Sequence, residues 1–104
     1  MPRPAYRRGM VTLHIEHGIT DIDTWRAAFA RFAEARRQAG VLAHRVSQPT
    51  DDSHYVLVDL DFADEQQAWR FAEFLREKVW PSSQNAPALA SDPLVRVLTV
   101  VARS

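Results

Sequence analysis

The chain has 104 residues, of which 46% are hydrophobic and 25% charged, and its thirteen Lys and Arg residues balance thirteen Asp and Glu residues. A chain of this size can build one hydrophobic core, so a single domain is expected. Zero net charge argues against nucleic-acid and membrane partners, because proteins usually bind both through an excess of basic residues. The absence of cysteine excludes disulfides, thiolate metal sites and a cysteine nucleophile. No apolar run approaches the ~20 residues that cross a bilayer. Together these features predict a small cytoplasmic protein.

The first forty residues predict an arm, a strand and a long helix. Residues 1–9 carry two prolines and three arginines without periodicity, so we expect a flexible N-terminal arm. Residues 11–16 alternate apolar and polar side chains, which is typical of a half-buried strand. Asp21 offers an N-cap, apolar residues then recur at spacings of three and four, and Gly40 suits a left-handed C-cap. This pattern predicts one amphipathic helix over residues 22–39.

The remaining chain predicts a hairpin, a second helix and a last strand. Residues 41–48 and 54–62 favour strands joined by turn-forming residues. Asp64 with Gln67 three residues later resembles a capping box, and the helix it opens ends at Pro81. A proline-rich loop over residues 81–93 leads into an apolar strand over residues 94–101.

The order strand, helix, strand, strand, helix, strand predicts an α+β fold over residues 10–104. It is a ferredoxin-like sandwich with antiparallel sheet order 4-1-3-2 and both helices on one face. Alternation directs Val11, Leu13 and Ile15 toward the helices and leaves a mixed, partly apolar opposite face. A monomer would expose too much apolar surface there, so we expect a homodimer with its two sheets packed face to face. The polar residues predicted on this dimer face are His14, Glu16, Arg45, Tyr55, Asp59, Asp61 and Arg96.

The imidazole and carboxylates of this face allow two interpretations. His14, Glu16, Asp59 and Asp61 have the donor types of a zinc or non-haem metal site. Salt bridges between these carboxylates and Arg45 or Arg96 of the dimer are the favoured interpretation. We therefore expect no metal and no other cofactor.

Several segments resemble those of the small dimeric α/β-barrel proteins. The stretch His17-Gly-Ile-Thr-Asp21-Ile-Asp-Thr-Trp25-Arg-Ala-Ala-Phe29 resembles their start, where a histidine closes the first strand, an aspartate opens the helix and a tryptophan follows one turn later. The other matching segments are Arg36-Arg37-Gln-Ala-Gly40, His44-Arg45-Val46, Asp51-Asp52 and Phe62-Ala-Asp-Glu-Gln-Gln-Ala68. The resemblance covers about residues 10–101. It implies that two ferredoxin-like protomers close a barrel, with a ligand pocket between the sheet and the helices of each.

Members of that superfamily differ in activity. They include cofactor-independent antibiotic-biosynthesis monooxygenases, haem-degrading monooxygenases, polyketide cyclases, muconolactone isomerases and proteins of no assigned activity. The haem-degrading branch uses an asparagine on the first strand and a tryptophan and a histidine on the second helix. Here that strand has no asparagine, that helix has no histidine, and Trp69 lies about a turn too early. The resemblance therefore argues against haem cleavage. The Tyr, Trp, Asn and Arg side chains of the quinone-forming enzymes do not map residue by residue onto this chain.

His17 is the first candidate catalytic residue. Strand parity places it on the helical side near Trp25, where an imidazole beside an indole in an apolar pocket suits a general base. In the alternative interpretation His17 bonds the backbone at the strand end and Trp25 packs in the core. His44 shares parity with Val46 and is the second candidate, whereas His54 near the hairpin tip is a weaker one.

Aromatic residues supply the predicted pocket walls, namely Trp25, Phe29, Trp69 and Phe71. Trp69, Phe74 and Trp80 extend the aromatic surface of the second helix toward the loop over residues 81–93. That loop is either a lid over a pocket rim or a long connection over a widened hydrophobic seam. The sequence contains no glycine-rich phosphate loop and no nucleophile elbow, which disfavours nucleotide cofactors and serine hydrolysis.

Three functions remain open at this point. The first is an enzyme that oxygenates, cyclises or isomerises a small aromatic or hydrophobic molecule without a bound cofactor. The second is a non-catalytic module that binds such a molecule, and the third is a structural dimerisation module. A cavity in which a histidine converges with an arginine or a tyrosine favours catalysis. An apolar cavity without polar groups favours binding, and a filled core favours the structural role.

Overall fold

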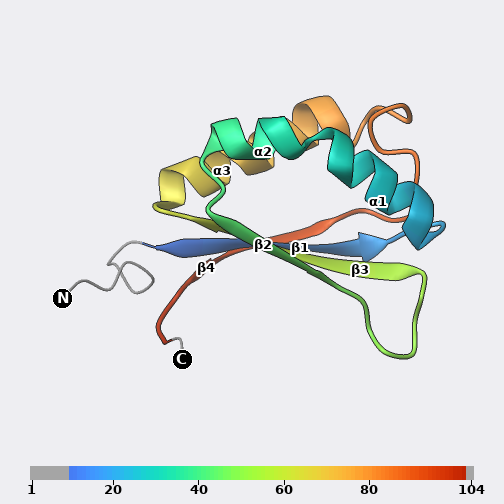
Figure 1. Cartoon of the computed structure of the whole chain (residues 1–104), viewed down its shortest axis with the longest axis horizontal. Helices are drawn as coiled ribbons and strands as arrows, with labels where there is room; N and C mark the ends of the chain where they lie inside the picture. Colours follow the sequence, from blue (N-terminus) through green and yellow to red (C-terminus); the bar gives the residue numbers. More distant parts are fainter. Residues whose placement is uncertain (1–9, 103–104) are drawn as a thin grey trace.

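The computed structural model describes residues 10–102, so the arm predicted over residues 1–9 lies outside the described part of the chain. The elements in chain order are β1 (Val11–Gly18), α1 (Ile22–Arg31), α2 (Ala33–Ala39), β2 (Ala43–Ser47), β3 (Tyr55–Phe62), α3 (Glu65–Phe74), the π-helical segment η2 (Leu75–Val79) and β4 (Leu94–Thr99). The strands form one antiparallel sheet in the order β2-β3-β1-β4, and the helices cover one of its faces (Figure 1). The predicted α+β ferredoxin-like fold is confirmed, including the strand order, which reads 4-1-3-2 from the other edge.

Period-two alternation in β1 and β3 separates the two faces of the sheet. In both strands every second residue is buried, and the register pairs Leu13 with Leu60 and Ile15 with Val58. These side chains meet Phe71 from α3 in the hydrophobic core. The predicted orientation of the strands is therefore confirmed, because the residues that alternate in the sequence are the ones that the helices cover.

The helix predicted over residues 22–39 is broken at Phe32. In a continuous helix the carbonyl of Phe29 would accept from the amide of Ala33. Here it accepts from the amide of Phe32 at 3.2 Å and from the Nη1 atom of Arg36 at 2.6 Å. A long side chain thus satisfies the carbonyl that the break releases. Neither proline nor glycine marks the break, so the sequence carries no local sign of it.

The predicted helix caps are present. Asp21 and Asp64 each accept a backbone N–H three residues later, and Gly40 has a φ of 99°, in the left-handed region. A Cβ atom on Gly40 would lie 2.7 Å from Nε2 of Gln67. The conformation therefore favours glycine at this position, and a larger residue would also have to displace the flexible end of the Gln67 side chain.

The second helix changes its winding after Phe74. The amide of Trp80 bonds the carbonyl of Leu75 at 2.8 Å, a five-residue step that defines the π-helical segment η2. Such wide turns are frequent at functional sites because they shift the side chains that follow. Leu75, Val79 and Trp80 of this region all line the cavity described below.

Candidate functional site

A cavity of about 90 Å³ lies between the sheet and the helices. The sheet contributes Ile15, His17, Val58 and Leu60, and the segment 85–89 closes one side. From the helices come Trp25, Ala28, Phe29, Phe32, Arg36, Phe71, Leu75 and Val79, with Trp80 directly after η2. Its walls are mostly apolar, and His17 and Arg36 are the ionisable groups among the described residues that line it.

His17 stands at the end of β1 and is 4% exposed. Its Nδ1 atom lies 2.9 Å from the carbonyl of Gly18. A carbonyl only accepts, so Nδ1 carries the proton, and in the neutral ring Nε2 keeps its lone pair. Burial lowers the pKa of His17, against a smaller opposing effect of the bond to Gly18. The ring is thus a neutral acceptor at neutral pH, which is the state that a general base requires.

Arg36 is the second ionisable group that lines the cavity and is 8% exposed. Besides the bond to the Phe29 carbonyl, its guanidinium carbon lies 3.6 Å from the centroid of the Phe29 ring. No carboxylate of the described residues forms an ion pair with it. Burial lowers the pKa of Arg36, although an arginine still remains charged at neutral pH.

We did not select Arg36 as a site residue from the sequence, although the spacing contained a sign of it. Trp25, Phe29, Phe32, Arg36 and Ala39 follow one another at steps of four, three, four and three residues. That is the apolar seam of a helix, so the arginine occupies a core-facing position. A single charged residue in such a seam is the signal that could have identified it.

Three of the four predicted pocket walls line the cavity. The Trp25 and Phe29 rings stack with centroids 4.8 Å apart, and Phe71 packs between Phe62 and Phe74. Trp69 is the exception and corrects the prediction: it is 40% exposed, and its Nε1 donates to Glu65 at 3.1 Å on the surface of α3. Trp80, the residue directly after Val79, lines the cavity instead.

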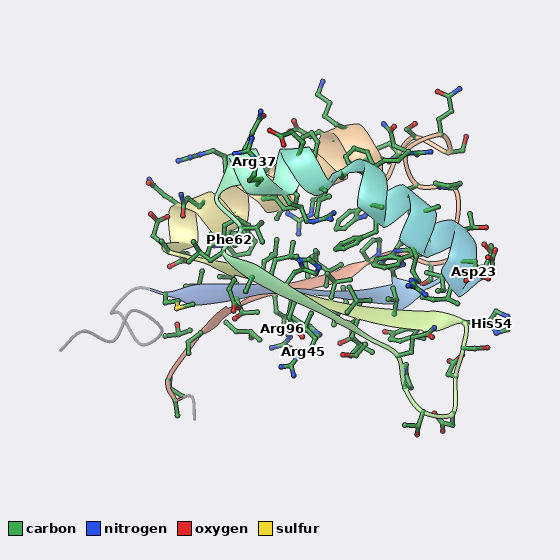
Figure 2. The ribbon with its side chains drawn as sticks, viewed as in Figure 1. Asp23, Arg37, Arg45, His54, Phe62 and Arg96 are labelled. Atoms are coloured by element: carbon green, nitrogen blue, oxygen red, sulfur yellow. The ribbon has the colours of Figure 1, made fainter. Side chains whose placement is uncertain are left out.

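His44 also lies elsewhere than predicted. It is exposed on β2, the edge strand, and touches the outer side of Phe29, with ring centroids 5.4 Å apart. It lines an open groove between α1 and β2, with Phe29 and Trp25 standing between this groove and the cavity. His44 does lie on the helix side of β2, as alternation predicted, but α1 does not extend far enough over this edge strand to bury it. His54 lies at the far end of the hairpin and points into solvent (Figure 2).

The loop after η2 is fastened to the end of β1. Ala90 donates to the carbonyl of Gly18 at 3.0 Å, Thr20 donates to that of Ala88 at 2.9 Å, and the amide of Gly18 donates to Oγ of Ser91 at 2.7 Å. These bonds hold residues 85–89 against the cavity beside His17. The loop therefore forms a wall of the cavity.

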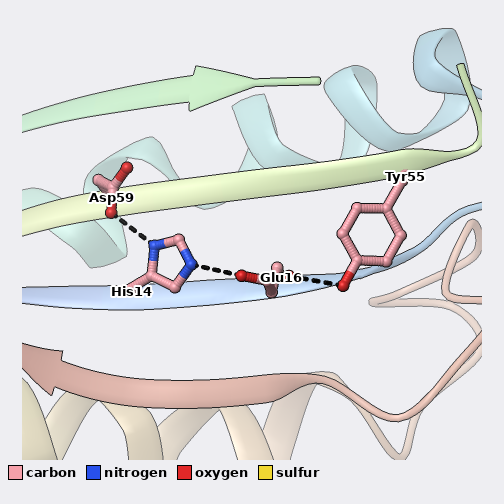
Figure 3. A network of polar contacts seen from close by, with 4 residues as sticks. All are labelled: His14, Glu16, Tyr55 and Asp59. Atoms are coloured by element: carbon pink, nitrogen blue, oxygen red, sulfur yellow. Dashed lines mark hydrogen bonds and ion pairs between the residues drawn. The ribbon is translucent and has the colours of Figure 1, made fainter. Parts of the chain in front are cut away.

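A polar network crosses the opposite face of the sheet (Figure 3). His14 places Nδ1 2.7 Å from Asp59 and Nε2 2.7 Å from Glu16, whose other oxygen accepts from the Tyr55 hydroxyl at 2.7 Å. Desolvation acts to lower the pKa of His14, but the bonds and charges of Glu16 and Asp59 outweigh it and raise that pKa. The bond to His14 in turn lowers the pKa of Glu16. Within one protomer, His14 thus bonds both carboxylates, and the charge of Arg96 also acts on Glu16.

The remaining residues predicted for this face lie on it as well. Asp61 accepts from Thr12 at 2.7 Å, and the side chains of Arg45 and Arg96 project from the side of the sheet away from the helices (Figure 2). Leu94 and Leu98 of β4 are 51% and 41% exposed. Over residues 10–102, no group of three histidine or acidic side chains is arranged to hold a metal ion.

Comparison with known proteins finds solved structures that have the same fold. No family model matches the chain, and no curated protein matches it in sequence. Among solved structures, a variant of SnoaB, a cofactor-independent oxygenase from Streptomyces nogalater, is 18% identical with a TM-score of 0.68, covering 92% of this chain and 97% of that one. A candidate antibiotic biosynthesis monooxygenase from Bordetella bronchiseptica is 14% identical with a TM-score of 0.68, covering 91% and 100%.

A third structure, a dimeric ferredoxin-like protein from an uncultured marine organism, is 10% identical with a TM-score of 0.62, covering 93% and 92%. The chain has the fold of these proteins. The structural resemblance indicated by the sequence is therefore confirmed. In the part of the chain that the structure describes, no helix is long and apolar enough to span a membrane.

Proposed function

We propose that the chain is an enzyme whose cavity binds a small aromatic or otherwise hydrophobic molecule and whose His17 removes a proton from it. The observation that carries this proposal is the presence of His17 and Arg36 in one apolar cavity. Two ionisable side chains that line one apolar cavity favour catalysis over a cavity that only binds and over a filled core. Each residue also has a structural contact, since His17 bonds the carbonyl of Gly18, as the alternative interpretation of the sequence required, and Arg36 bonds the carbonyl of Phe29.

Proton removal is the step shared by the three candidate reactions. The Nε2 lone pair of His17 takes the proton of an acidic C–H or O–H bond, and the electron pair remains on the substrate as an enolate or phenolate. Cyclisation and isomerisation continue from that anion. For oxygenation, dioxygen is the oxidant: an activated CH₂ becomes C=O, and the second oxygen atom leaves as water. Similarity in fold to an oxygenase that works without a cofactor supports this last branch.

The size of the cavity limits what enters without movement. At about 90 Å³ it is smaller than the engineered cavity of about 150 Å³ that holds benzene. Trp25 and Phe29 separate it from the groove beside β2, and both rings are only half-buried. Rotation of Trp25 would join the two spaces. We therefore expect an aromatic ligand to change the tryptophan fluorescence when it binds.

Hydrogen exchange of candidate substrates tests the proposed step directly. Enolisable aromatic ketones are incubated with the protein in D₂O without oxygen, and deuterium uptake at the acidic carbon is followed by NMR. We expect exchange to be accelerated by the wild type, to fall by about 10²-fold or more in His17→Gln, and to be unchanged in His54→Gln. Binding without accelerated exchange would make the chain a ligand-binding module. Oxygen consumption by the active compounds then separates oxygenation from cyclisation and isomerisation.

We also propose that two copies pair through the open face of the sheet. Support comes from the exposed Leu94 and Leu98, and from Arg45 and Arg96, which have no ion pair within residues 10–102. In a face-to-face pair these arginines would meet the carboxylates of the second copy. Light scattering at micromolar concentration should give twice the chain mass, and Leu98→Asp should give the single mass. A monomeric wild type would contradict the pairing.

A further inference from the structure

We infer that Arg36 is the receptor for an oxyanion, and that the molecule bound in the cavity carries a negatively charged oxygen next to this guanidinium. The inference rests on the proposed function and adds the chemical class of the ligand: a small apolar body with a carboxylate, enolate or phenolate. It follows from three features of the cavity.

The first feature is a buried cation without a counterion. Arg36 is only 8% exposed, and no described acidic residue forms an ion pair with it. A guanidinium has five N–H donors, and the structure shows one hydrogen bond, to the carbonyl of Phe29. Removing such a charge from water costs several kcal/mol unless partners replace the lost solvation. One carbonyl and one aromatic face replace part of it. Among the described residues, no nitrogen of Arg36 is both enclosed and without a hydrogen bond, so its remaining donors reach water-accessible space and are free to bind a ligand.

The second feature is the charge of the cavity itself. Its lining contains no aspartate or glutamate, and His17 is neutral because burial lowers its pKa. Arg36 is thus the only full charge on the described walls, and those walls are mostly apolar. In such surroundings an electrostatic attraction is much stronger than in water. The planar guanidinium also matches the two oxygens of a carboxylate better than a point charge would.

The third feature is that Arg36 lines the same cavity as the base. When His17 removes a proton from a carbon next to a carbonyl, the C–H bond breaks and its electron pair moves onto the carbonyl oxygen. That oxygen becomes negative at the moment of proton transfer. A fixed cation on the same cavity stabilises it, as oxyanion-binding groups do in other enzymes. The arginine would therefore serve both an incoming carboxylate and an enolate or phenolate formed in place.

The bond to Phe29 supports a competing explanation, in which Arg36 only fastens the break between α1 and α2. Ligand selectivity separates the two. Benzoate and its neutral counterpart benzamide are titrated against the wild type, Arg36→Met, Arg36→Lys and the surface control Arg37→Met, with tryptophan fluorescence as the readout. Arg37 is exposed and pairs with Glu34 on α2, away from the cavity (Figure 2).

We expect the wild type and Arg37→Met to bind benzoate about 10- to 100-fold more tightly than benzamide, which is the usual effect of a charged hydrogen bond. In Arg36→Met the preference should vanish while benzamide binding stays. Arg36→Lys keeps the charge without the planar fork and should lose several-fold of the preference. Should Arg36→Met fail to fold, an unchanged preference in Arg36→Lys would still overturn the inference.

A coloured phenol distinguishes an anion formed in place from one brought in. 4-Nitrophenol changes its absorbance on ionisation, so at constant pH the wild type should increase its phenolate band and Arg36→Met should not. An increase in this band together with benzoate preference assigns both roles to Arg36. Equal binding of benzoate and benzamide by the wild type would overturn the inference and leave the proposed function standing. Failure of all three probes to bind would overturn both.

Discussion

Replacing Arg36 by methionine should leave the protein about as stable as the wild type, although the residue is buried. The substitution removes a charged hydrogen bond at 2.6 Å, an interaction usually stabilising by about 1.5–3 kcal/mol. The Phe29 carbonyl keeps its bond from the amide of Phe32, so the lower part of that range applies. The contact at 3.6 Å from the ring of Phe29 contributes about 2 kcal/mol when desolvated.

Against these losses stands the desolvation of the guanidinium, which costs several kcal/mol without a counterion. Methionine keeps the apolar stem against Phe29 and removes that cost. The two sides nearly cancel, so we expect the free energy of unfolding to change by no more than about 1 kcal/mol. With an m-value of roughly 2 kcal/mol per molar urea, the midpoint should move by no more than about 0.5 M.

Urea unfolding followed by far-UV circular dichroism measures this difference. Arg37→Met is the control, because it breaks only an exposed pair with Glu34 and should change the stability by less than about 1 kcal/mol. If Arg36→Met lowered the free energy of unfolding by more than about 3 kcal/mol, Arg36 would mainly stabilise the break between α1 and α2 through its bond to Phe29. The argument that its unpaired charge is costly in the folded protein would then be refuted.

Three further predictions concern His17, the C-cap of α2 and the loop that lines the cavity. Burial lowers the pKa of His17 in the folded protein, so as the pH falls below the ordinary value of 6.5 the unfolded chain binds a proton before the folded chain does. The free energy of unfolding therefore falls with the pH. Between pH 7 and pH 5 the urea midpoint should fall less in His17→Gln than in the wild type. Gly40→Ala should lower the free energy of unfolding by about 1–2 kcal/mol or more because of the φ of 99°, and Gly40→Asn by less; equal stability of Gly40→Ala and wild type would contradict the strain. Ser91→Ala removes the acceptor of the Gly18 amide and should speed exchange of that amide in hydrogen-exchange NMR, whereas Ser83→Ala should not.

Local patterns were sufficient to predict the elements and their order. Alternation in β1 and β3, the caps at Asp21 and Asp64, and Gly40 after α2 each act over a few residues, so their physical effect is visible in a short stretch of sequence. Alternation also indicated that His17 would face the helices, and the cavity confirms that side.

The misplaced residues depend on contacts between distant segments. Trp69 belongs to the same helix as Phe71, but α3 turns it outward, where it bonds Glu65. His44 has the predicted parity and is nevertheless exposed, because burial at an edge strand depends on how far α1 reaches over it. The spacing of residues in a short stretch of sequence predicts neither how a helix is rotated against the sheet nor how far it covers a strand.

The 104 residues with balanced charge and no cysteine determined a one-core α+β domain, its strand order and its two chemically different sheet faces. Those properties follow from periodicity, capping and composition, which act locally. Only the tertiary structure decided that the first helix breaks at Phe32, that η2 turns Trp80 inward, and that Arg36 shares a cavity with His17. The reason is physical: whether a buried charge has a partner depends on every segment that packs around it, and residues that line the same cavity lie as far along the chain as Leu89.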